Sequence, residues 1–204
     1  MRGRARFGPI LAIGALACAG AGPPVPPSVA GAELTGNFLW RQHVLWSVGP
    51  ANGSAHAVIQ RRCDELVVLL LDALGVPGVE IHRRGGETKL VSRSRALPFE
   101  PEWILRDVER AYLRLPAPRG AEGAEVVSRA GELEVRERFV GERLEQRSYH
   151  RLADGEAVWV ARYGGSGTPD RVEIEDLELG YRLQITTVAR SQLDCPVEPA
   201  PSSP

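Results

Sequence analysis

The segment LPFEPEWILRDVERAYLRLP, residues 97–116, is the stretch on which the fold class depends. Its apolar residues follow the spacing of one helix face, at i, i+4, i+7 and i+11: Ile104, Val108, Ala111 and Leu115. Pro101 stands in the first turn, where a proline is tolerated, and Pro116 stands where a helix must end. We therefore predict one amphipathic helix over residues 100–115, with Trp103 and Tyr112 flanking its apolar stripe.

The residues on both sides of this helix alternate with the two-residue period of β-strands. Before it, strands are predicted over residues 38–48, 55–62, 65–71, 79–84 and 88–93. The predicted turns lie at Asn52-Gly53, at 75–78 and at Gly85-Gly86, and the run from Leu66 to Leu71 is typical of a strand buried on both faces. After the helix, alternating apolar residues stand at Leu133, Val135 and Phe139, at Ala157, Trp159, Ala161 and Tyr163, at Val172 and Ile174, and at Tyr181, Leu183 and Ile185.

Short strands linked by turns favour an antiparallel meander, and a single helix must pack against it. The predicted fold class is therefore α+β: a strongly curved antiparallel sheet or half-open β-barrel covered by one main helix. Residues 34–195 have the length of a single domain. Residues 196–204 are rich in proline and are predicted to form a disordered tail.

The first residues have the features of a bacterial secretion signal. Three arginines precede an apolar stretch over residues 7–17, which is too short to span a bilayer and runs into Cys18. Cys18 is then either the lipid-attachment residue of a lipoprotein or the first residue after an A-x-A cleavage site. Residues 19–33 form a Gly/Pro/Ala-rich tether, which an anchored domain needs, so the lipoprotein interpretation is favoured.

The composition contains no signal for catalysis, a cofactor or nucleic acid. The net charge is -1, and none of the four histidines (His43, His56, His82 and His150) has a second ligand at metal-binding spacing. The carboxylates Glu173/Glu175 and Glu134/Glu137 alternate with arginines and are interpreted as solvent-facing cross-strand partners. We expect no enzyme, no metal and no cofactor; a hydrolase would require a serine brought to His150 from elsewhere in the chain.

The two remaining cysteines, Cys63 and Cys195, leave two possibilities open. In an oxidising compartment they could form a disulfide that holds the end of the domain. They could equally remain separate thiols, because sequence spacing does not place them within bonding distance.

Three groups of residues resemble those of a known family. They are Trp40-Arg41-Gln42 in the first strand, the Leu97–Glu102 segment that opens the helix ending near Tyr112, and the closing strands Arg171–Ile174 and Gly180–Ile185. This order is similar to that of the bacterial lipoprotein family known as domain of unknown function 3261, over residues 34–188. The expected architecture is similar to that of the lipoprotein-localisation proteins LolA and LolB, a half-open antiparallel barrel whose apolar cavity receives acyl chains.

The resemblance implies an outer-membrane lipoprotein, facing the periplasm, that binds or transfers a lipid or a lipidated molecule. The alternatives are a soluble periplasmic protein and a structural lipoprotein that docks a protein partner and has no cavity. The family has no established catalytic residues to carry over. Large aromatic residues usually pack in cores, but some could line the expected cavity; the candidates are Trp40, Trp103 and Tyr112.

Overall fold

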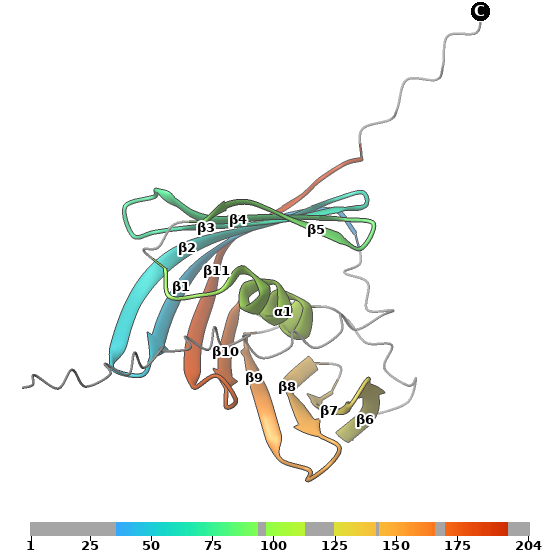
Figure 1. Ribbon diagram of the computed structural model, residues 1–204. Helices are drawn as coiled ribbons and strands as arrows, with labels where there is room; N and C mark the ends of the chain where they lie inside the picture. The colour runs from blue at the N-terminus through green and yellow to red at the C-terminus, as the bar shows by residue number, and fades with distance from the viewer. Residues whose placement is uncertain (1–35, 94–96, 113–124, 142, 166–169, 196–204) are drawn as a thin grey trace, which may run out of the picture.

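The fold is one open, curved sheet with a single helix on its concave side (Figure 1). The computed structural model describes residues 36–93, 97–112, 125–141, 143–165 and 170–195. Cys18, the predicted tether and the predicted tail lie outside these residues. The elements are β1 (Phe38–Val48), β2 (Ala51–Arg62), β3 (Glu65–Leu71), β4 (Pro77–Arg84), β5 (Glu87–Arg93), α1 (Pro101–Tyr112), β6 (Glu125–Ala130), β7 (Leu133–Val140), β8 (Arg143–Arg151), β9 (Ala157–Gly164), β10 (Arg171–Asp176) and β11 (Tyr181–Gln192).

The described strands form an 11-stranded antiparallel sheet in the order β5-β4-β3-β2-β1-β11-β10-β9-β8-β7-β6. The pairing of β1 with β11 brings the first and last strands together at its centre. In Figure 1 the sheet bends around α1, with β2 to β5 on one side of the helix and β8 to β6 on the other. The predicted α+β fold with a curved sheet and a covering helix is therefore confirmed. The sheet is open, because β5 and β6 are its two edges.

Strand alternation explains where the core lies. Inward side chains of β1, β2 and β11 are apolar at nearly every second position, whereas their outward neighbours are half-buried or exposed. The concave face and the buried side of α1 together enclose the core. Its largest fully buried side chains include Trp159, Tyr149 and Tyr181.

Two local predictions are wrong. The turn predicted at Asn52-Gly53 is not present, because β2 runs through both residues. The turn before β2 lies at Gly49-Pro50. Gly49 has a φ of +55°, a conformation that glycine adopts without steric cost. Gly53 lies under the indole of Trp46, where an added Cβ would stand 2.5 Å from a ring carbon, so this glycine serves packing and not a turn.

The second error concerns β3, which is buried on one face only. Leu66, Val68 and Leu70 are buried on the concave side, whereas Val67, Leu69 and Leu71 are half-buried on the other. A run of consecutive apolar residues hides the alternation that burial reveals. The described residues contain a single helix, and it is too short to cross a membrane.

The ends of three adjacent strands are joined near the chain's last described residues. Cys63, after β2, and Cys195, after β11, form a disulfide with a Cα–Cα distance of 5.6 Å, within the usual range. Beside it, Asn37 accepts a hydrogen bond from the Cys63 N–H on Oδ1 at 2.7 Å and from the Leu193 N–H on its carbonyl at 3.1 Å. The possibility that the sequence left open is thus resolved in the structure as a bridge across β1.

Candidate functional site

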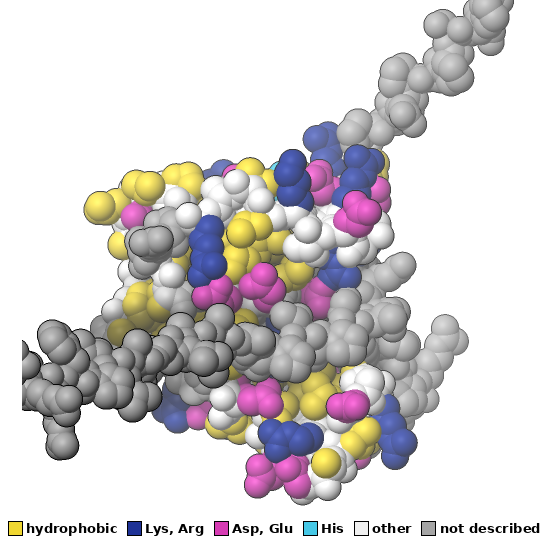
Figure 2. Space-filling view, in the orientation of Figure 1, with side chains coloured by type: hydrophobic (Ala, Val, Ile, Leu, Met, Phe, Trp, Pro, Cys, Tyr) yellow, Lys and Arg dark blue, Asp and Glu magenta, His cyan; other side chains and the backbone are white. Residues whose placement is uncertain are grey.

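A cavity of about 60 Å³ lies between α1 and the concave face. Hydrophobic side chains are visible between the upper strands and the helix in Figure 2. Only three polar residues, Gln42, Asp107 and Tyr112, belong to its wall. The other lining residues are Val44, Ala55, Ala57, Ile59, Val68, Leu70, Phe99, Ile104, Val108, Ile174, Leu183 and Ile185. We call this side of the concave face, formed mainly by β1, β2, β3 and β11, the apolar half.

Two of the polar residues in the cavity wall, Gln42 and Tyr112, form a hydrogen-bonded pair. Gln42 is almost fully buried, and its Nε2 donates to the Tyr112 hydroxyl at 2.9 Å and to Thr187 Oγ1 at 3.3 Å. Burial raises the pKa of Tyr112, so its hydroxyl keeps its proton at every physiological pH. These partners satisfy the buried amide, which would otherwise destabilise the fold.

Asp107 is the second polar group of the wall, and it holds the middle of α1. Its carboxylate accepts hydrogen bonds from Trp159 Nε1 at 2.9 Å and from the Tyr181 hydroxyl at 2.6 Å. Burial raises the pKa of Asp107 to about 6, although Arg106 and the two donors act in the opposite direction. Asp107 therefore loses its proton near neutral pH.

Arg106 joins the same cluster from the side of the helix. Its guanidinium contacts Asp176 Oδ2 at 2.5 Å and donates to the Tyr181 hydroxyl at 2.9 Å. Asp176 also accepts the backbone N–H groups of Glu178 and Leu179 on Oδ1, at 3.1 and 2.7 Å. The turn between β10 and β11 is thus bonded to the helix through one carboxylate.

The last turn of α1 is held by side chains of β8 and β9. Arg147 donates to the carbonyl of Arg110 at 2.6 Å, and the Tyr163 hydroxyl donates to the carbonyl of Ala111 at 2.8 Å. These carbonyls have no partner within a helix that ends here, so the sheet supplies their donors. Arg147 is itself neutralised by Glu137, with Nη2 and Oε1 2.6 Å apart.

The guanidinium of Arg110 lies against two aromatic rings. Its Cζ is 4.7 Å from the ring centroid of Tyr149 and 5.9 Å from that of Trp159. Burial lowers the pKa of Arg110, and the neighbouring charge of Arg106 lowers it further. We call this side of the concave face the polar half; it consists of Glu137, Arg147, Tyr149, Trp159, Tyr163, Asp176 and Tyr181.

The structure places the three candidate lining residues differently. Tyr112 lines the cavity. Trp40 lies just beyond Tyr112, with ring centroids 5.2 Å apart, and Trp103 stacks on Tyr181 at 6.0 Å on the other side of the helix. Neither indole belongs to the wall of this cavity.

The sequence contained an unused signal for the buried polar residues. Asp107 is three residues after Ile104 and four before Ala111, so it lies on the apolar stripe of the helix. Gln42 likewise shares its parity in β1 with Phe38 and Val44. A polar residue at a core position indicates a buried hydrogen-bond network.

Glu137 is a correction of the same kind. It has the parity of Leu133 and Val135 in β7 and is buried against Arg147, whereas the sequence assigned it to the solvent-facing side. The prediction holds for Glu173 and Glu175, which form exposed or half-exposed ion pairs with Arg171 and Arg182.

The hydrolase alternative requires a serine close to His150, and Ser148 of the same strand, β8, is in this position. Ser148 Oγ and His150 Nε2 are 2.9 Å apart, and His150 Nδ1 is 3.1 Å from the carbonyl of Gly155. Arg147 and Tyr149 face α1. Side chains alternate along a strand, so Ser148 and His150 face away from the helix. Ser148 is only 4% exposed, so this pair is not an open pocket around a serine hydroxyl. Among the described residues, no three metal-ligating side chains cluster.

Several solved structures of low sequence identity are similar to this chain. A LolA superfamily protein from Nitrosomonas europaea is 12% identical, with a TM-score of 0.51 over 84% of this chain and 93% of that chain. A putative outer membrane lipoprotein-sorting protein domain from Vibrio parahaemolyticus is 8% identical, with a TM-score of 0.45 over 80% of this chain and 88% of that one. A DUF1329 family protein from Desulfovibrio piger is 11% identical, with a TM-score of 0.44 over 85% and 89%.

The first of these likenesses shows a shared fold, in agreement with the expected LolA-like architecture. No curated protein matches the chain. The family model described as "Protein of unknown function (DUF3261)" matches residues 39–189, which include ten of the eleven strands completely or nearly so and the whole of α1. The chain therefore belongs to the DUF3261 family, as the residues of its first strand, helix and closing strands predicted.

Proposed function

We propose that this protein is a cell-envelope lipoprotein that binds, and hands on, a lipid or the acyl chains of a lipidated molecule. The observation that carries the proposal is the apolar cavity between α1 and the concave face. Apolar walls bind acyl chains by removing methylenes from water, each contributing about 0.8 kcal/mol. Such binding requires no catalytic group, so we infer a binding protein and not an enzyme.

The size of the cavity sets a condition on this function. Its volume of about 60 Å³ is well below the roughly 150 Å³ of an engineered apolar cavity that accepts benzene. A long acyl chain can therefore enter only if α1 moves away from the apolar half. The apolar contacts of Ile104 and Val108 are short-range, whereas the polar half holds the helix through directional hydrogen bonds.

We place the protein at the outer membrane, facing the periplasm. This location rests on the predicted secretion signal, the predicted lipidation of Cys18 and the predicted tether of residues 19–33, all from the sequence. Intact mass spectrometry of the mature protein tests it, because a diacylglyceryl group on Cys18 adds a large, defined mass. A mature chain without this mass would support the soluble periplasmic alternative.

Filling the cavity tests the binding function. The change Ala57→Leu adds three carbon atoms to a buried lining residue, so the affinity for a fluorescent fatty acid should fall at least about tenfold. Val58→Leu is the matched control: it lies on the same strand with its side chain on the opposite face, and it should leave affinity unchanged. Equal affinities of the two variants, or no uptake by the unmodified protein, would contradict the proposal.

The alternative is a lipoprotein that docks a protein partner. It would require a filled interior and an exposed apolar patch. The cavity favours lipid binding over this alternative. Co-purification of a stoichiometric protein partner, without lipid, from an envelope extract would reverse that preference.

A further inference from the structure

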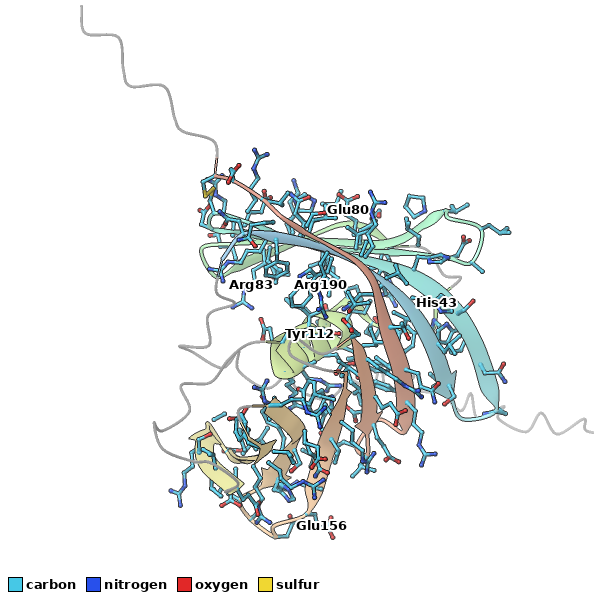
Figure 3. All side chains as sticks on the ribbon, turned by 180° about the vertical axis from the view of Figure 1, so that it is seen from behind. His43, Glu80, Arg83, Tyr112, Glu156 and Arg190 are labelled. Carbon is cyan, nitrogen blue, oxygen red and sulfur yellow. A yellow bond between two sulfur atoms is a disulfide. The ribbon has the colours of Figure 1, made fainter. Side chains whose placement is uncertain are left out.

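Two of the four histidines meet on the outer face of the sheet. His43 of β1 is paired in register with His56 of β2, and the centroids of their rings are 5.4 Å apart. Their neighbours along both strands line the cavity on the concave face: Gln42, Val44, Ala55 and Ala57. Side chains alternate along a strand, so both imidazoles point away from the cavity. In Figure 3, Tyr112 is labelled beside α1, whereas His43 is labelled on the strands at a distance from the helix.

The four histidines differ in what occupies their ring nitrogens. Both nitrogens of His82 lie within hydrogen-bonding distance of glutamates, and those of His150 lie within this distance of a serine hydroxyl and a backbone carbonyl. His43 and His56 form no hydrogen bond or ion pair with any other described residue. Their ring nitrogens therefore do not hold the fold together, and a neutral imidazole can offer a lone pair to a metal ion.

The separation of the two rings fits one shared metal ion. Imidazole nitrogens bind Zn²⁺ at ~2.0–2.1 Å with tetrahedral angles, which places the centroids of two ligating rings roughly 5 Å apart. The observed centroid distance of 5.4 Å is close to this value. His56 is exposed and His43 is half-buried, so rotation about their side-chain bonds can direct one nitrogen of each ring to a common point. Their partners on the next strands, Thr186 and Leu71, carry no charge that would repel a cation.

We propose that His43 and His56 form a two-histidine site for a divalent transition-metal ion, which binds Cu²⁺ more tightly than Zn²⁺. Imidazole suits both ions, and a given nitrogen site has the higher affinity for Cu²⁺. Among the described residues no third metal-ligating side chain joins the pair, so water completes the coordination of the ion. The site lies on the face opposite the cavity, and the inference does not depend on the proposed lipid binding.

Calorimetric titration of Zn²⁺ and Cu²⁺ into the full-length mature protein tests this site. One ion should bind per chain, and H43Q and H56Q should each lower the affinity at least about tenfold, because either change removes the gain from holding two ligands together. The double variant H43Q/H56Q should bind no more tightly than either single variant. H82Q/H150Q is the matched control: it also removes two histidines, but these lie on the separate strands β4 and β8, so it should keep the full affinity.

Two further measurements distinguish one shared ion from separate contacts with single histidines. At one equivalent of Zn²⁺ the ring signals of His43 and His56 should shift together in the NMR spectrum, while those of His82 and His150 keep their positions. The two imidazoles meet only in the folded sheet, so Zn²⁺ should raise the midpoint of thermal unfolding, and a chelator should reverse the rise. In H43Q the rise should be smaller.

Three results would overturn the inference. The first is that neither ion binds at micromolar concentration. The second is that H43Q or H56Q keeps the affinity of the unmodified protein, which would mean that the two rings do not share an ion. The third is that H82Q/H150Q loses as much affinity as H43Q/H56Q, which would place the ion elsewhere on the chain.

Discussion

On one side of α1 the concave face is apolar and incompletely filled, while on the other side it is polar and closely bonded. The apolar half contacts the helix through Ile104 and Val108 above a cavity. The polar half contacts it through buried hydrogen bonds to Asp107 and to the carbonyls of its last turn. The polar half therefore fixes the orientation of the helix, and the cavity lies between the helix and the apolar half.

This difference explains how a small domain can keep a cavity. Empty apolar space costs packing energy, so a helix over it needs other interactions to stay in place. Directional hydrogen bonds in a low-dielectric interior supply them, provided that every buried group has a partner. The comparison predicts that breaking the polar half lowers stability more than it lowers ligand binding, and that changes in the apolar half do the reverse.

The largest effect is expected for the buried ion pair of the polar half. The change Arg147→Met leaves Glu137 charged and buried, and it also removes the donor to the Arg110 carbonyl. Breaking such a pair costs about 3–5 kcal/mol of unfolding free energy, to be measured by urea denaturation. The double variant E137L/R147M should recover much of this loss, because it removes both charges.

The exposed ion pair of Arg171 with Glu173 provides the control for this prediction. R171M should cost less than about 1 kcal/mol, since water screens both charges. Similar losses for R147M and R171M would show that the polar half does not depend on its buried charges.

The disulfide comes next in expected size, and it lies outside both halves, beyond the ends of β2 and β11. It joins the ends of β2 and β11 across a sequence separation of 132 residues. The double change C63A/C195A should cost roughly 2–4 kcal/mol of unfolding free energy and raise the denaturant dependence, because the unfolded chain loses a long closed loop. A reducing agent should destabilise the unmodified protein by a similar amount and leave the variant unaffected.

The sequence predicted the architecture well because its strong signals were local. The apolar stripe of α1 and the alternation in β1 and β11 identify their elements without tertiary information. Strands β6 and β8 escaped prediction. In β8 the inward positions are occupied by Arg147 and Tyr149, so the strand has no run of alternating apolar residues to mark it.

The site was predicted less completely for a related reason. A cavity depends on how side chains from distant strands fit together, and the sequence contains no local signal for unfilled space. Tyr112 could be named because it borders the helix stripe, but the hydrogen bonds of Gln42 to Tyr112 and Thr187 depend on the pairing of β1 with β11. In the sequence, the charged residues of the polar half cannot be told from surface residues, because their burial depends on how the sheet curves around the helix.

The third prediction concerns the pH dependence of the polar half. Burial raises the pKa of Asp107 from its ordinary value of about 3.9 to about 6, so the folded protein binds this proton more tightly than the unfolded chain does. The stabilisation is complete below about pH 4 and is lost as the pH rises through about 6. At 1.36 kcal/mol per pH unit the difference amounts to roughly 3 kcal/mol.

The variant D107N isolates this contribution. The unfolding free energy of the unmodified protein minus that of D107N should fall between pH 4 and pH 7. Asp154 is the control, because the N–H of Glu156 and the Arg151 guanidinium lower its pKa. Its stabilisation is present above the ordinary pKa and is lost on acidification, so the corresponding difference for D154N should not fall over this range. If the difference in unfolding free energy between the unmodified protein and D107N did not change over this range, the raised pKa of Asp107 would be refuted.

The smallest effect is expected on the outer face of the sheet, where His82 of β4 lies between two glutamates. Its ring nitrogens are 2.8 Å from Glu80 Oε1 and 3.0 Å from Glu65 Oε1, and these hydrogen bonds raise the pKa of His82. Its stabilisation is therefore complete below the ordinary histidine pKa of about 6.5 and is lost as the pH rises through the raised value. Because the side chain is about one-third exposed, we expect less than about 1 kcal/mol. In E80Q an NMR titration should give a lower pKa for His82, and half-molar salt should shrink the difference between the two proteins. The pH dependence assigned to Asp107 should change little at the same salt concentration, because its charge is buried. Equal salt sensitivity at both sites would contradict the electrostatic difference between the interior of the polar half and the outer surface.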